Sequence, residues 1–312
     1  MRLRDLSAKQ LEQRLRGDGL RWRTGPALFN LQSDVAQVGP WLQRFYGAAP
    51  VEQAGEHLTT CHVGVLRERG LRRWVRPQVR IWVDGPAPFI PFALDHTPPN
   101  LEWGLNFLIS TRLLNFFILH AAALERDGGV LLMPGVPGSG KSTLAAALSQ
   151  QGWRLLSDEF GIIAPHTKQA IPIPKSIALK NASIDALAAL YPNAPMGPRF
   201  PNTRKGTVAH LPCGDEALEK MAQRAEVRWI IFPRFEQGQG MQLESVMPDR
   251  LFPRLAGGAF NYESLGAAAF QTVATLAESV PAYAMHYGDM AQALATIAQI
   301  TTTAQITAGE QP

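Results

Sequence analysis

Cysteine is scarce in this chain, and long apolar runs are missing from it. Cys61 and Cys213 are the only two cysteines in 312 residues, so they form neither a disulfide framework nor a zinc-binding spacing. The longest apolar run, "LLNFFILHAAAL", is shorter than the ~20 residues that span a bilayer. The opening "MRLRDLSAKQLEQRLR" lacks the apolar core of a signal peptide. We therefore expect a cytoplasmic protein that has no membrane partner.

Charged residues make up only 18% of the chain and hydrophobic residues 46%, a composition typical of a folded globular protein. The length allows one large domain or two ordinary ones. Residues 1–112 carry 15 Lys and Arg against 10 Asp and Glu, whereas the remaining 200 residues carry 15 against 16. The positive charge is therefore concentrated in the amino-terminal part.

Much of that charge lies in the segment "RERGLRRWVRPQVR", where Trp74 stands among the arginines. The segment has two interpretations: a docking surface for an acidic partner, or the solvated face of a twisted hairpin. No nucleic-acid-binding motif accompanies it, so we expect no nucleic-acid partner. The arginines are Arg67, Arg69, Arg72, Arg73, Arg76 and Arg80.

Strand and helix patterns alternate along the chain and indicate an α/β fold. Residues 20–90 are predicted to be mostly extended, and the apolar segment 101–118 is predicted to form a helix. We place a domain boundary near residue 112, which gives a smaller, mostly β domain over 1–112 and a second domain over 113–312. The second domain begins with a predicted hairpin that turns at Asp127-Gly128-Gly129.

The strongest motif is "GVPGSGKST", which follows a short apolar strand pattern and precedes an alanine-rich helix pattern over 143–151. Its spacing, Gly135-x-x-x-x-Gly140-Lys141-Ser142, is that of a P-loop, and the strand–loop–helix context argues against a chance glycine-rich turn. In a P-loop, backbone N–H groups and the helix N-terminus hold phosphate oxygens, the Lys reaches the β- and γ-phosphates, and the Ser hydroxyl binds Mg²⁺. The predicted ATP contacts are Gly135, Pro137, Gly138, Ser139, Gly140, Lys141, Ser142 and Thr143.

A pair of acids, Asp158 and Glu159, follows the apolar "LL" shortly after the predicted P-loop helix. Two acids at a strand end are ordinarily solvated surface, but P-loop enzymes need an acid at a strand end to organise Mg²⁺. Adjacent side chains on a strand point to opposite faces, so the two acids are expected to have different roles.

These segments carry a resemblance. The stretch "LHAAALERDGGVLLMPGVPGSGKSTLAAALSQQGWRLLSDEFGII" resembles the core of bacterial HPr kinase/phosphorylase. More narrowly, "RRWVRPQVRIWVDG", "PFIPF" and "LEWGLNFLIS" resemble the group called HprK-related kinase A. The resemblance implies a P-loop kinase core of the HPr kinase/phosphoenolpyruvate carboxykinase type, which transfers the ATP γ-phosphoryl group to a serine hydroxyl.

Carried over by position, the resemblance makes Asp158 the proton acceptor and places His120 near the transferred phosphate. It places the second acid at Glu159, where HPr kinase has Asp, and Ser142 with Glu159 is the expected Mg²⁺ ligand pair. HPr kinase has a further segment with a Glu that helps to bind Mg²⁺. The corresponding stretch here is "PIPKSIALKNAS", which offers Lys175 and Lys180 but no acid. Either Mg²⁺ is held by Ser142 and an acid of the 158–159 pair, or the metal site is incomplete. This departure also leaves the phosphorylase activity and the HPr substrate open.

The segment "FPNTRKGTVAHLP" places Arg204 and Lys205 in a predicted loop. Phosphoryl transfer needs positive charge on the equatorial oxygens, and Arg204 or Lys205 is the candidate, with Arg204 taken as the catalytic residue; a solvated turn is the alternative. Asp289 is predicted to be a helix N-cap.

Three classes of function follow from these motifs. The first is an ATP- and Mg²⁺-dependent kinase acting on a serine of a protein or peptide, or on a small hydroxylated molecule. The second is a nucleotide hydrolase, and the third is a nucleotide-binding scaffold that docks a partner. We expect the kinase, with the acceptor and a homo-oligomeric state left open by the sequence.

Overall fold

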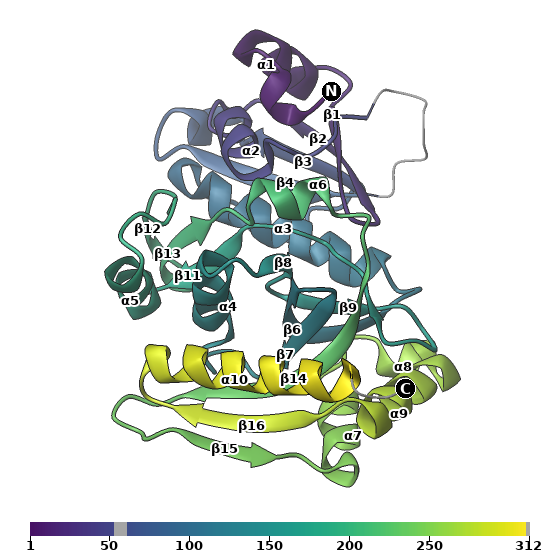
Figure 1. Ribbon diagram of the computed structural model, residues 1–312. Helices are drawn as coiled ribbons and strands as arrows, with labels where there is room; N and C mark the ends of the chain where they lie inside the picture. Colours follow the sequence, from purple (N-terminus) through teal and green to yellow (C-terminus); the bar gives the residue numbers. More distant parts are fainter. Residues whose placement is uncertain (53–60, 310–312) are drawn as a thin grey trace. The chain divides into compact units, whose positions relative to one another are not determined.

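The computed structural model describes residues 1–52 and 61–309, and the chain divides into two compact units (Figure 1). Unit 1 comprises residues 1–114 and 171–223, and unit 2 comprises residues 115–170 and 224–312. The contiguous domains predicted over 1–112 and 113–312 divide the chain differently, because residues 171–223 pack with the first 114. The side chains of Arg72, Arg73 and residues 303–309 lie outside the described part.

Unit 1 is built from two sheets and the helices beside them. Its elements are η1 (Leu3–Asp5), α1 (Ala8–Arg16), β1 (Leu20–Thr24), β2 (Ala27–Ser33), α2 (Val38–Tyr46), β3 (Cys61–Arg67), η2 (Gly70–Arg73), β4 (Gln78–Val83), β5 (Phe92–Ala93), η3 (Leu94–His96), α3 (Thr97–Arg112), β11 (Ile177–Lys180), α5 (Ala182–Leu190), β12 (Phe200–Thr203), β13 (Gly206–Leu211) and α6 (Asp215–Glu219).

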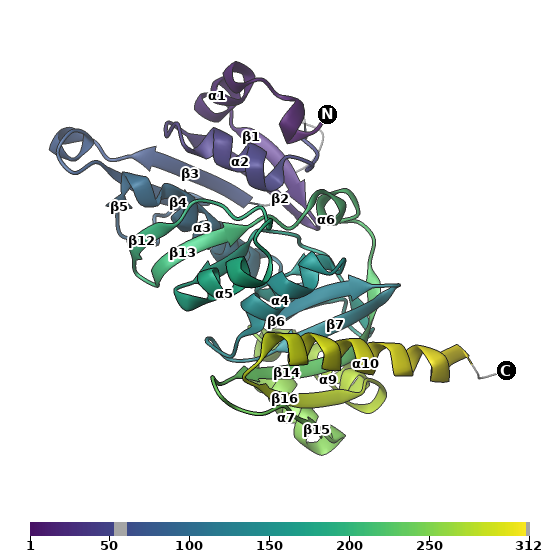
Figure 2. The same cartoon turned by 60° about the vertical axis from the view of Figure 1, so that its left-hand side comes forward.

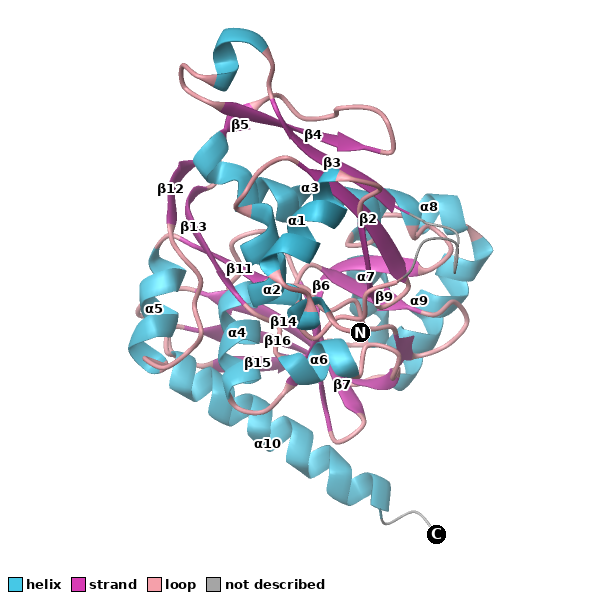
Figure 3. Ribbon diagram, turned by 90° about the horizontal axis from the view of Figure 1, so that it is seen from above, coloured by secondary structure: helices cyan, strands magenta, loops and turns pink. Residues whose placement is uncertain are grey.

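The larger sheet of unit 1 has the order β1-β2-β3-β4-β5, and only the β2–β3 pair in it is parallel. Figure 3 shows β2, β3 and β4 side by side. The smaller sheet has the order β11-β13-β12. Residues after 170 rejoin this unit through specific contacts, such as the bond from the Thr24 hydroxyl to the Pro174 carbonyl at 2.6 Å.

Two sequence predictions for this region are wrong in part. The stretch 20–90 contains a helix, α2, whose apolar residues Trp41, Leu42 and Phe45 are buried. The helix predicted over 101–118 ends at Arg112, and Phe117 already belongs to a strand of unit 2. An apolar run can form a buried strand or a helix. Hydrophobic periodicity over 101–118 therefore did not show that the helix ends before Phe117.

Unit 2 contains the segment that carries the predicted nucleotide site. Its elements are β6 (Phe117–Arg126), β7 (Gly129–Pro134), α4 (Lys141–Gln150), β8 (Arg154–Ser157), β9 (Phe160–Ile163), β10 (Gln169–Ala170), β14 (Ala225–Phe235), β15 (Gln242–Ser245), α7 (Pro248–Gly257), α8 (Tyr262–Leu265), α9 (Ala267–Ser279), β16 (Ala282–Tyr287) and α10 (Met290–Gly309).

The sheet of unit 2 runs in the order β10-β9-β6-β7-β14-β16-β15, with β8 also paired to β6. Its centre, β7-β14-β16, is parallel, and β6 joins it antiparallel through the hairpin with β7. That hairpin turns at Asp127 and Gly128, both with positive φ, as the sequence predicted. Helix α10 runs along β16 in Figures 1 and 2 and also contacts α4.

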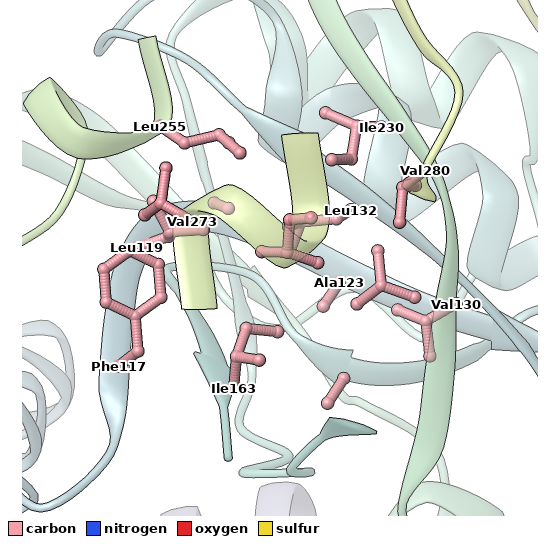
Figure 4. Packing of buried hydrophobic residues seen from close by; sticks show 14 of the residues in the cluster. Phe117, Leu119, Ala123, Val130, Leu132, Ile163, Ile230, Leu255, Val273 and Val280 are labelled. Carbon is pink, nitrogen blue, oxygen red and sulfur yellow. The ribbon is translucent and has the colours of Figure 1, made fainter. Parts of the chain in front are cut away.

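The core of unit 2 lies between one face of this sheet and the helices α7 and α9 (Figure 4). Phe117, Leu119, Ala121 and Ala123 of β6 belong to this core and alternate along the strand. Because strand side chains alternate between faces, His120 lies on the opposite face.

The helices and sheets of the two units together confirm the α/β fold class.

None of the helices in the described ranges combines the length and apolar character needed to cross a membrane.

Candidate functional site

The glycine-rich segment 135–140 connects β7 to α4, so strand, loop and helix follow one another as the sequence predicted. Gly138 and Gly140 have φ angles of 87° and 95°, in the left-handed region that favours glycine. The side chain of Lys141, at the first position of α4, turns back over the loop. Its Nζ donates to the carbonyl of Gly135 and to that of Val136, the latter at 3.1 Å.

Neighbouring strands hold both ends of the loop. The N–H of Gly135 donates to the carbonyl of His120 on β6 at 3.4 Å, and the N–H of Phe235 on β14 donates to the carbonyl of Ser139 at 3.0 Å. The loop therefore lies at the carboxyl edge of the parallel strands β7, β14 and β16. In open α/β sheets this edge is where ligands bind.

Two buried hydroxyl groups lie within or against the loop. The Oγ of Ser139 and the hydroxyl of Tyr287 have no hydrogen-bond partner among the described residues. A Cβ placed on Gly135 would lie 3.0 Å from the Ser139 Oγ, and one on Gly140 would lie 2.8 Å from the Tyr287 hydroxyl. Burial raises the pKa of Tyr287, so this hydroxyl keeps its proton and remains a donor. Buried hydroxyls of this kind call for a ligand or water partner.

The two predicted acids lie between β8 and β9, which both pair with β6. Ser157 faces Ala123 and Phe160 faces His120, so Asp158 and Glu159 lie beside the middle of β6. On the other side of β6, Ala121 faces Pro134, the last residue before the loop. Neighbouring strands are about 4.8 Å apart, so the acids and the loop start are separated by roughly 10 Å of sheet. Asp158 is buried, whereas Glu159 is partly exposed.

His120 lies on β6 between the acids and the loop. Its backbone N–H donates to the carbonyl of Gly258 at 2.9 Å, and its ring meets that of Phe260 edge-on at 5.8 Å between centroids. Asn261 connects the segment around Phe260 to the start of β6. Its side chain accepts from the Ile118 N–H at 3.0 Å and donates to the Phe116 carbonyl at 2.7 Å. Residues 258–261 were not predicted to belong to the site, since nothing local in them signals a site more than a hundred positions away.

The other predicted site residues belong to unit 1. Arg204 is exposed at the turn of the β12–β13 hairpin, where the sequence had predicted a loop. Lys205 lies over the ring of Trp103, with 5.0 Å from Nζ to the ring centroid. The structure therefore assigns Arg204 to the unit without the glycine-rich loop.

Lys175 forms a buried ion pair in unit 1. Its Nζ lies 2.7 Å from Glu102 Oε2, and the Trp41 indole and the Tyr46 hydroxyl also donate to this carboxylate. Burial alone would raise the pKa of Glu102, but the electrostatic effects of Lys175 and His210 and the hydrogen bonds from Lys175 and Trp41 outweigh it and lower the pKa. Lys175 is thereby engaged as a structural partner within unit 1.

No group of three or more His, Cys, Asp or Glu in the described ranges could hold a metal ion. Mg²⁺ in phosphoryl transfer enzymes commonly uses only one or two protein ligands, with substrate phosphates and water completing the shell. The partly exposed Ser142 and Glu159 fit that smaller role.

Asp289, the predicted helix cap, precedes α10. Its Oδ1 accepts from the Gln292 N–H at 2.9 Å, and its carbonyl accepts from the Ala293 N–H at 3.2 Å. The N-cap prediction is confirmed.

Two comparisons with known proteins gave no match: no protein-family model matches the chain, and no curated protein matches it.

Proposed function

We propose that unit 2 binds ATP at the loop 135–143 and transfers the γ-phosphoryl group to a hydroxyl, most readily the hydroxyl of a serine in a protein or peptide. One observation carries this proposal. The register of β6 aligns the start of the loop, His120 and the pair Asp158-Glu159 on neighbouring strands. Phosphoryl transfer needs this set of groups together: phosphate donors, a proton acceptor and an acid for the metal.

The phosphate-binding part of the proposal rests on the loop itself. Glycines at positive φ allow successive backbone N–H groups to converge, and the N-terminus of α4 adds partial positive charge. The open space around Gly138, where an added Cβ would meet nothing within 4 Å, leaves room for a phosphate. Lys141, which donates to two loop carbonyls, is positioned to exchange those weak acceptors for charged phosphate oxygens.

The chemical part rests on the groups around β6. A serine hydroxyl is a poor nucleophile, and we assign to the carboxylate of Asp158 the removal of its proton during transfer. We assign to Lys141 the balancing of the charge that develops on the transferred group, and to His120 a contact with the same oxygens. Asp158 is only 7% exposed, so its carboxylate acts away from bulk water.

The metal would be held by Ser142, in the first turn of α4, and by Glu159, between β8 and β9. Mg²⁺ supplies charge neutralisation to the phosphate oxygens. The family resemblance to HPr kinase agrees with these roles and with the serine acceptor. Positive charge from Arg204 is not required by this scheme, and its role stays a prediction.

To test the proposal, the full chain is incubated with γ-labelled ATP, Mg²⁺ and candidate serine peptides or small hydroxylated molecules. The masses of the products are then measured by mass spectrometry. We expect label on an acceptor, and we expect Lys141→Ala to weaken ATP binding roughly 10- to 100-fold, because one charged phosphate contact is worth about 1.5–3 kcal/mol. Lys168→Ala is the matched control, since Lys168 in the same unit pairs with Glu226.

Three outcomes would contradict parts of the proposal. Label released only as inorganic phosphate would make the protein a hydrolase. ATP binding without any ADP formation would make it a scaffold. Equal ATP affinity in the Lys141 and Lys168 variants would remove the loop from nucleotide binding.

A further inference from the structure

Phe235 is a large aromatic residue that stays partly open to solvent at the rim of the glycine-rich loop. It ends β14, and 44% of its surface is exposed. Its backbone N–H holds the Ser139 carbonyl, and its Cβ lies 3.0 Å from the position that a Cβ on Gly140 would take. Its ring meets the ring of Tyr287 at 5.6 Å, at an interplanar angle of 65°. The contacts with Ser139, Gly140 and Tyr287 therefore fix the position of the Phe235 ring, and the exposed part of the ring faces solvent.

The order of the strands gives the loop two different sides. β6, with His120 and the neighbouring acids, flanks β7 on one side, and β14, with Phe235 at its end, flanks β7 on the other. In the proposed function, the terminal phosphate of ATP lies toward the acids. The rest of the nucleotide then extends toward the β14 side.

The turn that follows Phe235 is preformed. The N–H of Glu236 donates to the Tyr287 carbonyl at 3.0 Å, and the N–H of Gln239 donates to the Glu236 carbonyl at 3.0 Å. Gly288 is packed so closely that an added Cβ would lie 2.6 Å from the Gln239 carbonyl oxygen. A surface already ordered in this way pays little conformational entropy when a ligand binds.

We propose that the exposed face of Phe235 is the nucleoside wall of the site, where it stacks on the base or packs against the ribose of the bound nucleotide. The proposal rests on the proposed function, because it takes its direction from the terminal phosphate. Aromatic stacking contributes to the affinity for the nucleoside and nothing to the affinity for the phosphates. Phe235 is thus assigned to binding, and not to the chemical step.

The test separates the nucleoside from the phosphates. Full-length protein is titrated calorimetrically, with Mg²⁺ present, with ATP and with inorganic tripolyphosphate. We expect wild type to bind ATP more tightly than tripolyphosphate. Phe235→Ala should lose roughly 5- to 100-fold in ATP affinity, with tripolyphosphate affinity unchanged within two-fold, and Phe235→Trp should retain ATP affinity. Phe270→Ala on α9 is the control, because Phe270 is 55% exposed in the same unit.

The outcomes that overturn the inference are distinct from each other. If Phe235→Ala weakens both ligands equally, Phe235 supports the loop and does not contact the nucleoside. If wild type binds both ligands equally well, there is no nucleoside wall, although phosphate binding by the loop stands. If wild type binds neither ligand, the proposed function and this inference fall together.

Discussion

The hydroxyl of Tyr287 lies 2.8 Å from the position that a Cβ on Gly140 would take, so the structure has no room for a larger residue there. Tyr287 ends β16, and Gly140 comes immediately before α4. Two segments that are almost 150 positions apart in the sequence thus determine the shape of the glycine-rich loop together. Any side chain at position 140 would push the loop away from the strand ends.

Gly140→Ala is therefore expected to weaken ATP binding with the fold retained. The backbone at φ 95° and the Tyr287 hydroxyl both oppose a Cβ. Backbone strain of this kind costs about 1–3 kcal/mol, which corresponds to roughly 5- to 150-fold in affinity if the loop must relax. Calorimetric titration with ATP measures the loss.

Gly152→Ala is the matched control for that variant. Gly152 has a φ of 87°, but an added Cβ there would meet nothing within 4 Å, and the residue lies at the far end of α4. This substitution should lower the melting temperature and leave ATP affinity unchanged. Comparable losses of affinity in both variants would show that general destabilisation, and not the shape of the loop, is responsible.

The acid pair should separate into two roles. Asp158→Asn keeps the size of the side chain but removes the proposed base, so phosphoryl transfer should fall by roughly 10²–10⁴ while ATP affinity holds within a few-fold. Glu159→Gln should act through the metal, and higher Mg²⁺ concentration should recover part of its loss. Transfer rates and ATP affinities measured across a Mg²⁺ series check both expectations. If the Asp158→Asn variant transfers phosphate at the wild-type rate, the assignment of Asp158 as the base is wrong.

His210 makes the stability of the protein sensitive to acid. Its ring is fully buried in unit 1, with neither nitrogen bonded among the described residues. Burial lowers the pKa of His210 to about 4; Glu102 acts against this shift, and Lys175 and Lys180 add to it. Between pH 6.5 and about 4, His210 is therefore protonated in the unfolded chain but neutral in the folded chain. Stability falls as the pH falls through this range.

From this shift, lowering the pH from 7 to 5 should cost about 2 kcal/mol of unfolding free energy through His210. His210→Leu should remove most of that dependence, and urea unfolding at the two pH values measures it. His62→Leu, at an exposed position of the same unit, should leave the dependence as it is. An identical pH dependence in wild type and His210→Leu would exclude His210 as its source.

The basic segment of unit 1 allows a test of acceptor docking. Arg69 and Arg76 are exposed beside Trp74, which is 78% exposed, whereas Arg80 is bound to Glu68 at 2.5 Å. Reversing the charge at Arg69 and Arg76 should reduce phosphorylation of a protein or peptide acceptor more than ATP turnover without acceptor. The two rates, measured at low and high salt, test this prediction. Equal effects on both rates, at an unchanged melting temperature, would reject docking by this segment.

Much of the local structure around the site could be predicted from the sequence. The strand before Gly135, the loop with its two glycines at positive φ, the following helix and the turn at Asp127-Gly128 all have signals within a few residues. Such features depend on backbone conformation and on side chains close in the chain. Asp289 belongs to the same class, because a cap forms with its own helix.

The helix boundary near residue 112 could not be predicted in this way. The apolar residues from Leu113 to Leu119 suit a helix or a buried strand equally well. Pairing with β9 and with residues 258–260 decides in favour of a strand from Phe117 onward. The helix α2 is a different case. Its apolar residues Val38, Trp41, Leu42, Phe45 and Tyr46 recur at helical spacing, so the sequence carried a local signal for this helix that the prediction of a mostly extended segment overlooked.

The sequence by itself determined which chemical groups this protein has and the local shape of the loop that could hold a phosphate. Only the tertiary structure decided which groups lie together: His120 and the acids on the β6 side, Phe235 and Tyr287 on the β14 side, and Arg204 in the other unit. The physical reason is that strand order and register arise from hydrogen bonds and packing between segments up to about 150 residues apart. Local propensity carries no information about those pairings.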